Sequence, residues 1–352
     1  MSTKGPLHLG GPFLCPHVVF KSRKMPVIVP MLWHSFGWFS FPITVVTVAL
    51  LTAIVPDTDP VLLDTTPPVI HVLGTVQDGG SPHIGCDRIC CRNLFLRPAT
   101  DRQVVSLGLI DADNGKSFLF EATPDLPTQW HHLQKLGGGK MKWPDGIFLT
   151  HAHMGHYSGL MHLGREALGS HGVPVYAMPR MMQFLQENGP WSQLVELKNI
   201  TLMPLQNEQR VQASDALEII PIEVPHRDEF SETVGYRIVG PSRSVLFIPD
   251  INKWDQWDRL LEDELRQVDR AYLDATFYDV DEVGYRDMAE IPHPFMIETM
   301  DLLQDLTQKE RSKVHFIHMN HTNPCLEEAS AAYREVRERG FNIARLGDSF
   351  SL

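Results

Sequence analysis

Three closely spaced histidines constrain this chain more than any other feature. His151, His153 and His156 lie in the segment Thr-His-Ala-His-Met-Gly-His, after a short apolar run at 145–150 and before a helical pattern at 157–168. The end of a strand is a rigid position from which side chains converge on one pocket. Neutral imidazole is also a preferred ligand of zinc and iron. We therefore predict a metal site here, in preference to three loop histidines in solvent.

Short apolar runs rich in β-branched residues alternate with helix-like stretches along most of the chain. Strands are predicted over residues 69–73, 104–110, 118–120, 147–149, 173–177, 217–224, 234–239, 245–248 and 314–317. Helices are predicted near residues 125–136, 157–168, 179–188, 252–267, 295–309 and 325–339. This alternation, without internal repeats, indicates a layered α/β architecture.

Residues 1–60 differ in composition from the rest. The stretch 25–55 contains no Asp, Glu, Lys or Arg, and a short basic group at 21–24 precedes it. Its most apolar part, 43–55, is shorter than the ~20 residues that a spanning helix needs. Extension toward the N-terminus gives enough length but includes Pro42, which would kink the helix.

A basic group before an apolar block is typical of a signal peptide, a signal anchor or an organelle-targeting region. No clear small-x-small cleavage motif follows, which favours an uncleaved anchor and membrane association through the N-terminus. The alternative is an apolar leader without such a role, or a start codon at Met25 or Met31. We expect 1–60 to be a targeting or membrane-anchor leader, 61–68 a linker, and 69–352 one domain. Without the anchor, a cytoplasmic location is expected.

The charge balance excludes one class of function. The 352 residues carry a formal net charge of -12, and no long basic run offsets it. General nucleic-acid binders need clustered Lys and Arg to contact phosphates. We therefore expect a small-molecule substrate and no nucleic-acid partner, and the oligomeric state stays open.

Further histidines and an acidic residue follow later apolar runs. His226 comes after the run at 217–224, Asp250 after 245–248, and His318 after 314–317. One ligand at the end of each of several strands assembles a site from parts distant in sequence.

This order of ligands resembles the metallo-β-lactamase superfamily from about residue 69 to the C-terminus. The segments 73–86 and 318–324 are similar to the branch with coenzyme PQQ biosynthesis protein B and the cyclic-phosphate phosphodiesterase of phosphonate breakdown. The resemblance implies an αββα four-layer sandwich with a zinc pocket at one sheet edge, holding one or two ions. It implies a first position formed by His151, His153 and His226, a second formed by His156 and His318, and Asp250 bridging both.

Position 155 departs from the family pattern. Most hydrolytic members have an aspartate there that ligates the second metal and orients the attacking water, whereas this chain has Gly155. A missing carboxylate also removes negative charge that would offset two close cations. We therefore predict a weakened second position and a single ion, and expect Gly155→Asp to raise the second occupancy. Fe²⁺ is the alternative metal, because histidines and a carboxylate with open positions suit oxygen-using iron enzymes.

Two more side chains are expected near the centre. His293, between two prolines, resembles in position a histidine of the phosphodiesterase and transfer-RNA-processing members that contacts the substrate phosphate and donates a proton; the alternative is a turn residue. Asp274 ends a strand-like run, where it would hold a ligand histidine in its tautomer or cap the local structure.

The resemblance implies a second, structural zinc site formed by Cys86, Cys90, Cys91 and His321. Three thiolates and one imidazole make a closed tetrahedral set. The spacing departs from the tighter Cys-x-Cys-x-x-Cys pattern, and buried or disulfide-bonded cysteines are the alternative. Reduced thiolates suit an intracellular compartment, which conflicts with a secretory leader.

Three functions remain open from the sequence. The leading hypothesis is a metal-dependent hydrolase of a phosphodiester or related small ester, with His293 as proton donor. The second is an iron-dependent oxygenase or hydroxylase similar to the PQQ biosynthesis protein. The third is a carrier that binds a small anion without catalysis.

Overall fold

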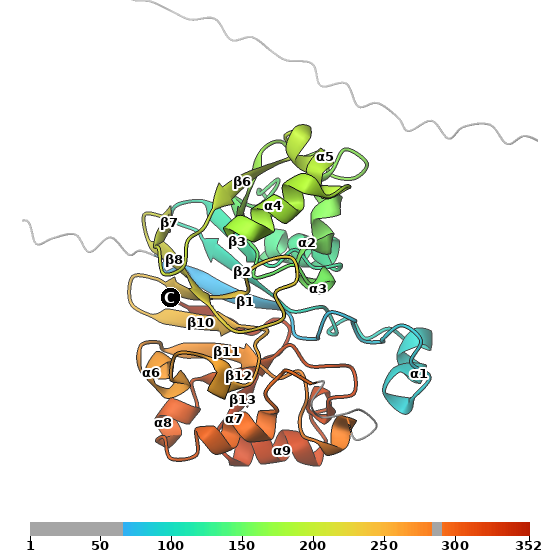
Figure 1. The fold of residues 1–352 in the computed structure, drawn as a ribbon, viewed down its shortest axis with the longest axis vertical. Coiled ribbons are helices and arrows are strands. Elements are labelled where there is room, and N and C mark those ends of the chain that lie inside the picture. Colours follow the sequence, from blue (N-terminus) through green and yellow to red (C-terminus); the bar gives the residue numbers. More distant parts are fainter. Residues whose placement is uncertain (1–65, 284–290) are drawn as a thin grey trace, which may run out of the picture. The chain divides into compact units, whose positions relative to one another are not determined.

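A computed structural model describes residues 66–283 and 291–352. Two seven-stranded sheets pack face to face, with helices on both outer faces (Figure 1). The first sheet has the order β14-β1-β2-β3-β4-β5-β6, and the second has the order β13-β12-β11-β10-β9-β8-β7. The predicted αββα sandwich is confirmed.

The strands have these bounds. The first sheet contains β1 (Val69–Gly74), β2 (Ser106–Asp111), β3 (Lys116–Phe120), β4 (Gly146–Phe148), β5 (Val173–Ala177), β6 (Ile200–Pro204) and β14 (Ser349–Ser351). The second contains β7 (Val211–Ser214), β8 (Leu217–Glu223), β9 (Val234–Val239), β10 (Ser244–Ile248), β11 (Arg270–Asp274), β12 (Val314–Ile317) and β13 (Asn342–Ile343).

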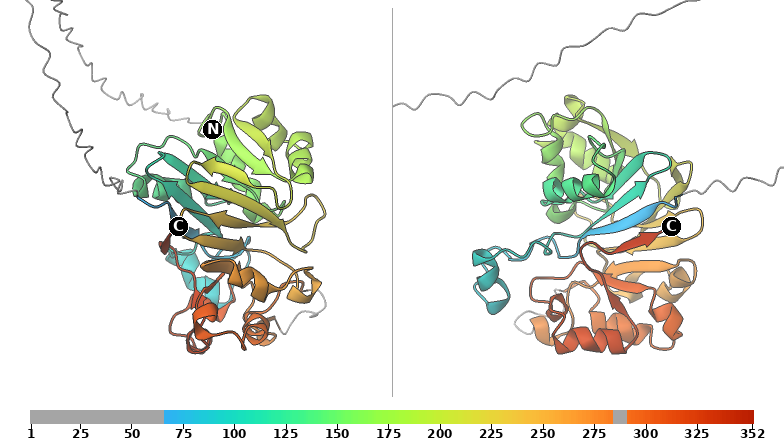
Figure 2. Two further views of the ribbon diagram at one scale, coloured as in Figure 1. Left: turned by 90° about the vertical axis from the view of Figure 1, so that its left-hand side faces the viewer. Right: turned by 180° about the vertical axis from the view of Figure 1, so that it is seen from behind.

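The helices fall into two groups, one for each sheet (Figure 2). Those on the first sheet are α2 (Leu126–Leu136), α3 (Met154–Tyr157), α4 (Pro179–Glu187) and α5 (Trp191–Glu196). Those on the second are α6 (Leu261–Arg266), α7 (Met296–Leu302), α8 (Gln308–Arg311) and α9 (Ala331–Glu338). A further helix, α1 (Ile89–Leu96), lies apart from the sandwich.

The two sheets share one plan. β1, β2 and β3 are antiparallel and continue into parallel β4, β5 and β6. In the second sheet, β7 to β10 are antiparallel and continue into parallel β11, β12 and β13. The segments that follow β4, β10 and β12 meet in one region, because Asp250 lies 3.3 Å from His151 and 3.9 Å from His318.

Aromatic side chains fill the space between the sheets. Phe148 stacks on Phe120 with ring centroids 5.3 Å apart and on Tyr176 at 4.3 Å. From the second sheet, Tyr236 meets Phe148 at 5.7 Å, and its hydroxyl donates a hydrogen bond to the Leu149 carbonyl. This packing lies directly before the histidine segment and fixes the strand from which that segment begins.

Several predicted elements differ from the structure. A regular helix over 157–168 is wrong, because α3 gives way to a 3-10 helix at Ser158–Leu163. The backbone there passes so close to Thr123 that a Cβ on Gly159 would lie 1.9 Å from its carbonyl oxygen. The helix expected over 252–267 is reduced to a 3-10 turn and α6.

Four strands, β6, β7, β13 and β14, had no predicted counterpart, and β11 was indicated only by the strand-like run that Asp274 ends. The four without a counterpart are the edge strands of the two sheets. An edge strand needs no continuous apolar run, and β7 has no fully buried residue. Its sequence is therefore hard to distinguish from a loop.

The predicted leader, 1–60, and most of the predicted linker lie outside the described residues, so the domain boundaries stay a prediction. Within the described part of the chain, no helix has the length and apolar character needed to cross a bilayer.

Phe148→Ala should lower the free energy of unfolding by about 3–5 kcal/mol, because it removes a fully buried ring that bridges the two sheets. Urea denaturation gives the value directly. Leu302→Ala, at a position 41% exposed on α7, is the control and should change stability by under about 1 kcal/mol. Equal losses in the two variants would contradict this account of the core.

Candidate metal centre

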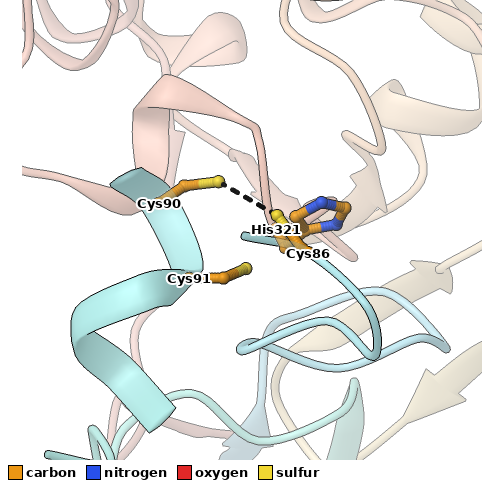
Figure 3. Close-up of side chains that lie close together, drawn as sticks. All are labelled: Cys86, Cys90, Cys91 and His321. Carbon is orange, nitrogen blue, oxygen red and sulfur yellow. Dashed lines mark hydrogen bonds between the residues drawn. The ribbon is translucent and has the colours of Figure 1, made fainter. Parts of the chain in front are cut away.

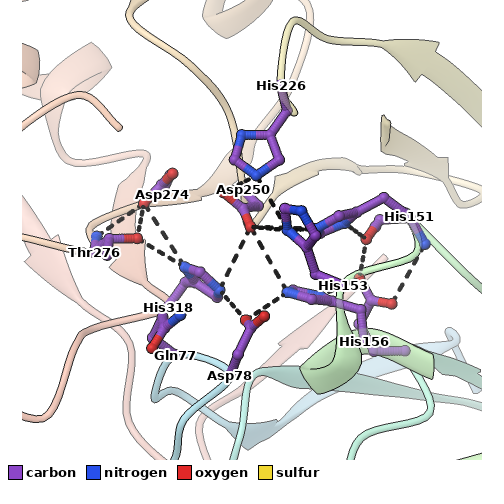
Figure 4. A network of polar contacts seen from close by, with 12 residues as sticks. Gln77, Asp78, His151, His153, His156, His226, Asp250, Asp274, Thr276 and His318 are labelled. Carbon is purple, nitrogen blue, oxygen red and sulfur yellow. Dashed lines mark hydrogen bonds and ion pairs between the residues drawn. The ribbon is translucent and has the colours of Figure 1, made fainter. Parts of the chain in front are cut away.

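The loops between the sheets bring all six predicted ligands of the catalytic centre together (Figure 4). The ligand atoms form two groups, and within each group they lie within 4.8 Å of one another. The first group is His151, His153, His226 and Asp250; the second is Asp78, His156, His318 and Asp250. Asp250 belongs to both, as the predicted bridging role requires. Metal binding by these residues stays a prediction.

In the first group, three imidazoles face one point. His151 Nε2 lies 2.8 Å from His153 Nδ1, which lies 3.3 Å from His226 Nε2. Asp250 approaches His151 Nε2 at 3.3 Å and His226 Nε2 at 3.2 Å. His151 and His226 are buried, and His153 is partly exposed.

The second group contains a carboxylate that the sequence prediction missed. Asp78, in the turn after β1, places Oδ1 2.9 Å from His156 Nε2 and 3.1 Å from His318 Nε2. Asp250 Oδ2 lies 3.8 Å from His156 Nε2 and 3.9 Å from His318 Nε2. A site with two imidazoles and two carboxylates is not short of negative charge.

The expectation that Gly155→Asp would add a missing ligand is wrong. A Cβ on Gly155 would lie 2.5 Å from Asp78 Cα and 2.7 Å from its Cβ. The carboxylate expected from position 155 would therefore collide with one already present. The weakened second position was inferred from the glycine alone, and Asp78 removes that reason.

Two similar chains of hydrogen bonds orient the imidazoles. The Thr150 hydroxyl donates to Glu121 Oε1 at 2.5 Å and lies 2.8 Å from His151 Nδ1. The Glu121 carboxylate also lies 3.1 Å from His156 Nδ1. With Nδ1 of both rings held in this way, their Nε2 atoms face the centre.

The second sheet repeats the arrangement. The Thr276 hydroxyl donates to Asp274 Oδ1 at 2.7 Å and lies 2.9 Å from His318 Nδ1 (Figure 4). His226 Nδ1 lies 3.1 Å from Asn252 Oδ1. Asp274 reaches His318 through Thr276, and its carboxylate also accepts hydrogen bonds from the Ile251 and Thr276 amides at 3.1 Å and 2.8 Å. Both predicted roles, orienting a ligand and capping the local structure, therefore stay open. Glu121, Asn252 and the two threonines were not predicted.

His293 lies beside both groups. Its Nδ1 is 2.8 Å from Asp274 Oδ2 and 3.1 Å from Asp250 Oδ1. Burial alone would lower the pKa of His293, but these two carboxylates raise it to about 10. His293 also borders a cavity of about 380 Å³. The turn-residue alternative gives no reason for this placement between two carboxylates.

The charges of the centre favour ionised carboxylates. Burial alone would raise the pKa of Asp250, but His226 and His293 hold it well below its ordinary range. Burial alone would lower the pKa of His156, but Asp78, together with a second carboxylate, raises it well above 6.5. Asp250 and Asp78, whose pKa values are both lowered, are therefore ionised at neutral pH.

The donor set fits a divalent cation. Asp250 Oδ1 is buried and has no hydrogen-bond partner within the described residues, although two imidazole nitrogens lie 3.1–3.2 Å away. The facing ring nitrogens of His151, His153 and His226 lie 2.8–3.3 Å apart. Such close nitrogens need a proton or a cation between them. Imidazole and carboxylate together suit zinc, and suit ferrous iron as well.

The cysteine site also assembles as predicted. Cys86, Cys90, Cys91 and His321 lie within 4.8 Å of one another, and Cys86 Sγ is 3.8 Å from Cys90 Sγ (Figure 3). No disulfide forms among the described cysteines. Burial and the neighbouring thiols raise the pKa of Cys90 to about 12, so a thiolate there needs an adjacent cation. This grouping favours the structural zinc over the disulfide alternative.

Comparison with known proteins decides the family. The family model described as “Beta-lactamase superfamily domain” matches residues 116–337. The chain belongs to this superfamily. Coenzyme PQQ synthesis protein B from Nitrosococcus oceani is 24% identical over 309 residues, covering 78% of this chain and 97% of that protein. The predicted resemblance is therefore confirmed.

Two solved structures share the fold. Zn²⁺-bound PqqB from Methylobacterium extorquens aligns with a TM-score of 0.66 and 20% identity, covering 81% of this chain and all of that one (100%). A diphosphatase from the PhnP family aligns with a TM-score of 0.55 and 21% identity, covering 82% and 98%. At these identities the likenesses show the metallo-β-lactamase fold, whose members bind metal ions.

Thr150→Val should weaken the first metal position by about 10- to 100-fold, because it removes the hydroxyl that holds His151 Nδ1. Zinc affinity measured by competition with a chelator gives the change. Thr150→Ser keeps the hydroxyl and should restore most of the affinity, and Thr201→Val, at an exposed position, should have no effect. An unchanged zinc affinity in Thr150→Val would show that the Thr150 hydroxyl does not orient His151 for metal binding.

Cys91→Ser should reduce bound zinc by about one equivalent per chain and leave the catalytic centre loaded, because the cysteine site is closed and separate in its ligands. Elemental analysis after dialysis measures the loss. Cys325→Ser, at a buried free thiol outside the group, is the matched control. Equal metal content in both variants would contradict a structural zinc.

Proposed function

We propose that this chain is a metal-dependent hydrolase of a phosphodiester or a related small ester. One observation carries the proposal: two ligand groups share Asp250 beside a polar cavity. Paired metal positions of this kind suit in-line displacement at phosphorus, where one side of the reaction needs an activated water and the other a stabilised leaving group. The PhnP-family neighbour, a diphosphatase by its name, supports this class of substrate.

The ions would be held by the two groups already described. A bound divalent cation makes water acidic enough to act as a nucleophile near neutral pH and polarises a phosphoryl oxygen. The protein contributes fixed positions: Glu121 and Asp274 orient the imidazoles through Thr150 and Thr276. Asp250 holds the two groups together.

The cavity beside the centre suits an anion. It has a volume of about 380 Å³, and none of the described residues that line it carries a carboxylate. Arg227, His83 and His293 contribute basic or protonatable groups, whereas Phe277 and Ile291 form an apolar side. A small phosphoester with an apolar substituent matches this combination of charge and surface.

His293 is placed to donate a proton to the leaving group. Asp274 holds its Nδ1 at 2.8 Å, and the ring borders the cavity. Within the described residues, Nε2 has no hydrogen-bond partner. An imidazole fixed at one nitrogen and open at the other is the usual arrangement of a general acid.

A PqqB-like oxidative reaction is the second candidate. It is favoured by relatives named coenzyme PQQ synthesis protein B, which this chain matches over 97% and 98% of their length. Metal analysis of the purified protein separates the two. Zinc with turnover of bis(p-nitrophenyl) phosphate supports the hydrolase; iron with substrate-dependent oxygen consumption supports the oxygenase. Binding of a small anion without turnover would support the third hypothesis, a carrier without catalytic activity.

His293→Gln should lower kcat for bis(p-nitrophenyl) phosphate by about 10²- to 10⁴-fold, the range for loss of a general acid. Its metal content should match that of the unsubstituted protein, because His293 is placed as a donor and not as a ligand. The exposed His131→Gln is the control. Loss of one equivalent of metal in His293→Gln would make His293 a ligand and overturn the assignment.

A further inference from the structure

The turn after β1 carries an acidic side chain into the second ligand group. Asp78 Oδ1 lies 2.9 Å from His156 Nε2 and 3.1 Å from His318 Nε2 (Figure 4). The side chain of Asp78 is 14% exposed, and both imidazoles are fully buried. A single carboxylate oxygen therefore faces the inward nitrogens of both rings.

The main chain fixes this turn against the segment that carries His318. The Gln77 amide donates to the Met319 carbonyl at 2.9 Å, and the Met319 amide donates to the Thr75 carbonyl at 2.8 Å. Two backbone hydrogen bonds thus bracket the residues next to Asp78 and His318. This pairing brings the Asp78 and His318 side chains close together.

Gly155 leaves the space that Asp78 occupies. A Cβ at position 155 would lie 2.5 Å from Asp78 Cα, 2.7 Å from its Cβ and 2.8 Å from its Cγ. Two of these atoms belong to the side chain and one to the backbone, so a rotamer change would not relieve the contact. A side chain at position 155 and the observed position of Asp78 exclude each other.

We propose that Asp78 supplies the carboxylate ligand of the second metal position, and that Gly155 is required because any larger residue would displace it. The ligand that most hydrolytic members carry after the second histidine has moved to a different segment, 77 residues earlier in this chain. The second position is then complete, with two imidazoles and two carboxylates. This inference rests on the proposed metal-dependent function, but it concerns the number of ions bound and not the reaction.

The decisive measurement is the zinc content of the full chain and of two variants, Asp78→Asn and Gly155→Ala. Each protein is stripped with a chelator, titrated with zinc by calorimetry, and checked by elemental analysis. The unsubstituted chain should bind two ions at the catalytic centre in addition to one at the cysteine site. Each variant should lose about one equivalent, with the affinity for the second ion reduced by more than ~100-fold, since outer partners alone account for 10–100-fold.

Asp78→Asn preserves shape and removes charge, whereas Gly155→Ala leaves the carboxylate intact and removes its space. Zinc retained at the cysteine site and at the first position shows that each variant is folded. Asp101→Asn, at an exposed acid outside the centre, should bind the full complement.

Three results would overturn the inference: a full complement in Asp78→Asn, a single catalytic-centre ion in the unsubstituted chain, or loss of both ions in Asp78→Asn. A full complement in Gly155→Ala would overturn the requirement for glycine. Failure of the proposed function has a different outcome: the metal counts would follow this pattern while bis(p-nitrophenyl) phosphate is not hydrolysed.

Discussion

The carboxylate of Asp250 is the interaction on which the site depends. Six imidazoles approach it at 3.1–3.9 Å, and it is only 3% exposed. A buried charge without compensation costs several kcal/mol, and Asp250 is compensated by the imidazoles that surround it. Asp250 follows β10, an inner strand of the second sheet, whereas three of the imidazoles follow β4 of the first. The polar centre is therefore also a junction between the two halves of the sandwich.

The two halves support this junction in the same way. In each half, a carboxylate, a threonine hydroxyl and an imidazole form a chain of hydrogen bonds. The chain beside the first sheet is Glu121–Thr150–His151, and the chain beside the second is Asp274–Thr276–His318. Glu121 and His318 both have positive φ, 81° and 67°. Such backbone costs on the order of 1–3 kcal/mol for residues other than glycine. Strand pairing on either side holds both residues there, so part of the fold's stability is committed to orienting the ligands.

The apolar runs allowed the fold class to be predicted, and the resemblance to the superfamily pointed to the six candidate ligands. The structure brings these six together, because His151, His226, Asp250 and His318 each follow an inner strand. The residues that contact the candidate ligands from behind, such as Glu121 and Asn252, are not marked by a sequence pattern of this kind. Glu121 directly follows β3, where an acid is usually a surface residue, and Asn252 follows Asp250 in an irregular loop. Asp78 was missed for a different reason. Gly155 was interpreted as the loss of a carboxylate, whereas only three-dimensional proximity shows that it makes room for one. The Asp-Gly-Gly turn after β1 was the available indication.

The cysteine group and part of the second ligand group come from the same two segments. The turn that carries Asp78 continues to Cys86, Cys90 and Cys91, and the loop that carries His318 continues to His321. Between them, His83 stacks on His321 with ring centroids 4.4 Å apart, and both border the cavity. A metal held by the cysteine group would clamp these segments together at one end, while the backbone pairing of Gln77 with Met319 holds the other end. His151, His153 and His226 lie on other loops and gain nothing from this clamp. The cysteine site would therefore support the cavity wall and the turn that carries Asp78, while its ligands stay separate from those of the histidine-rich centre.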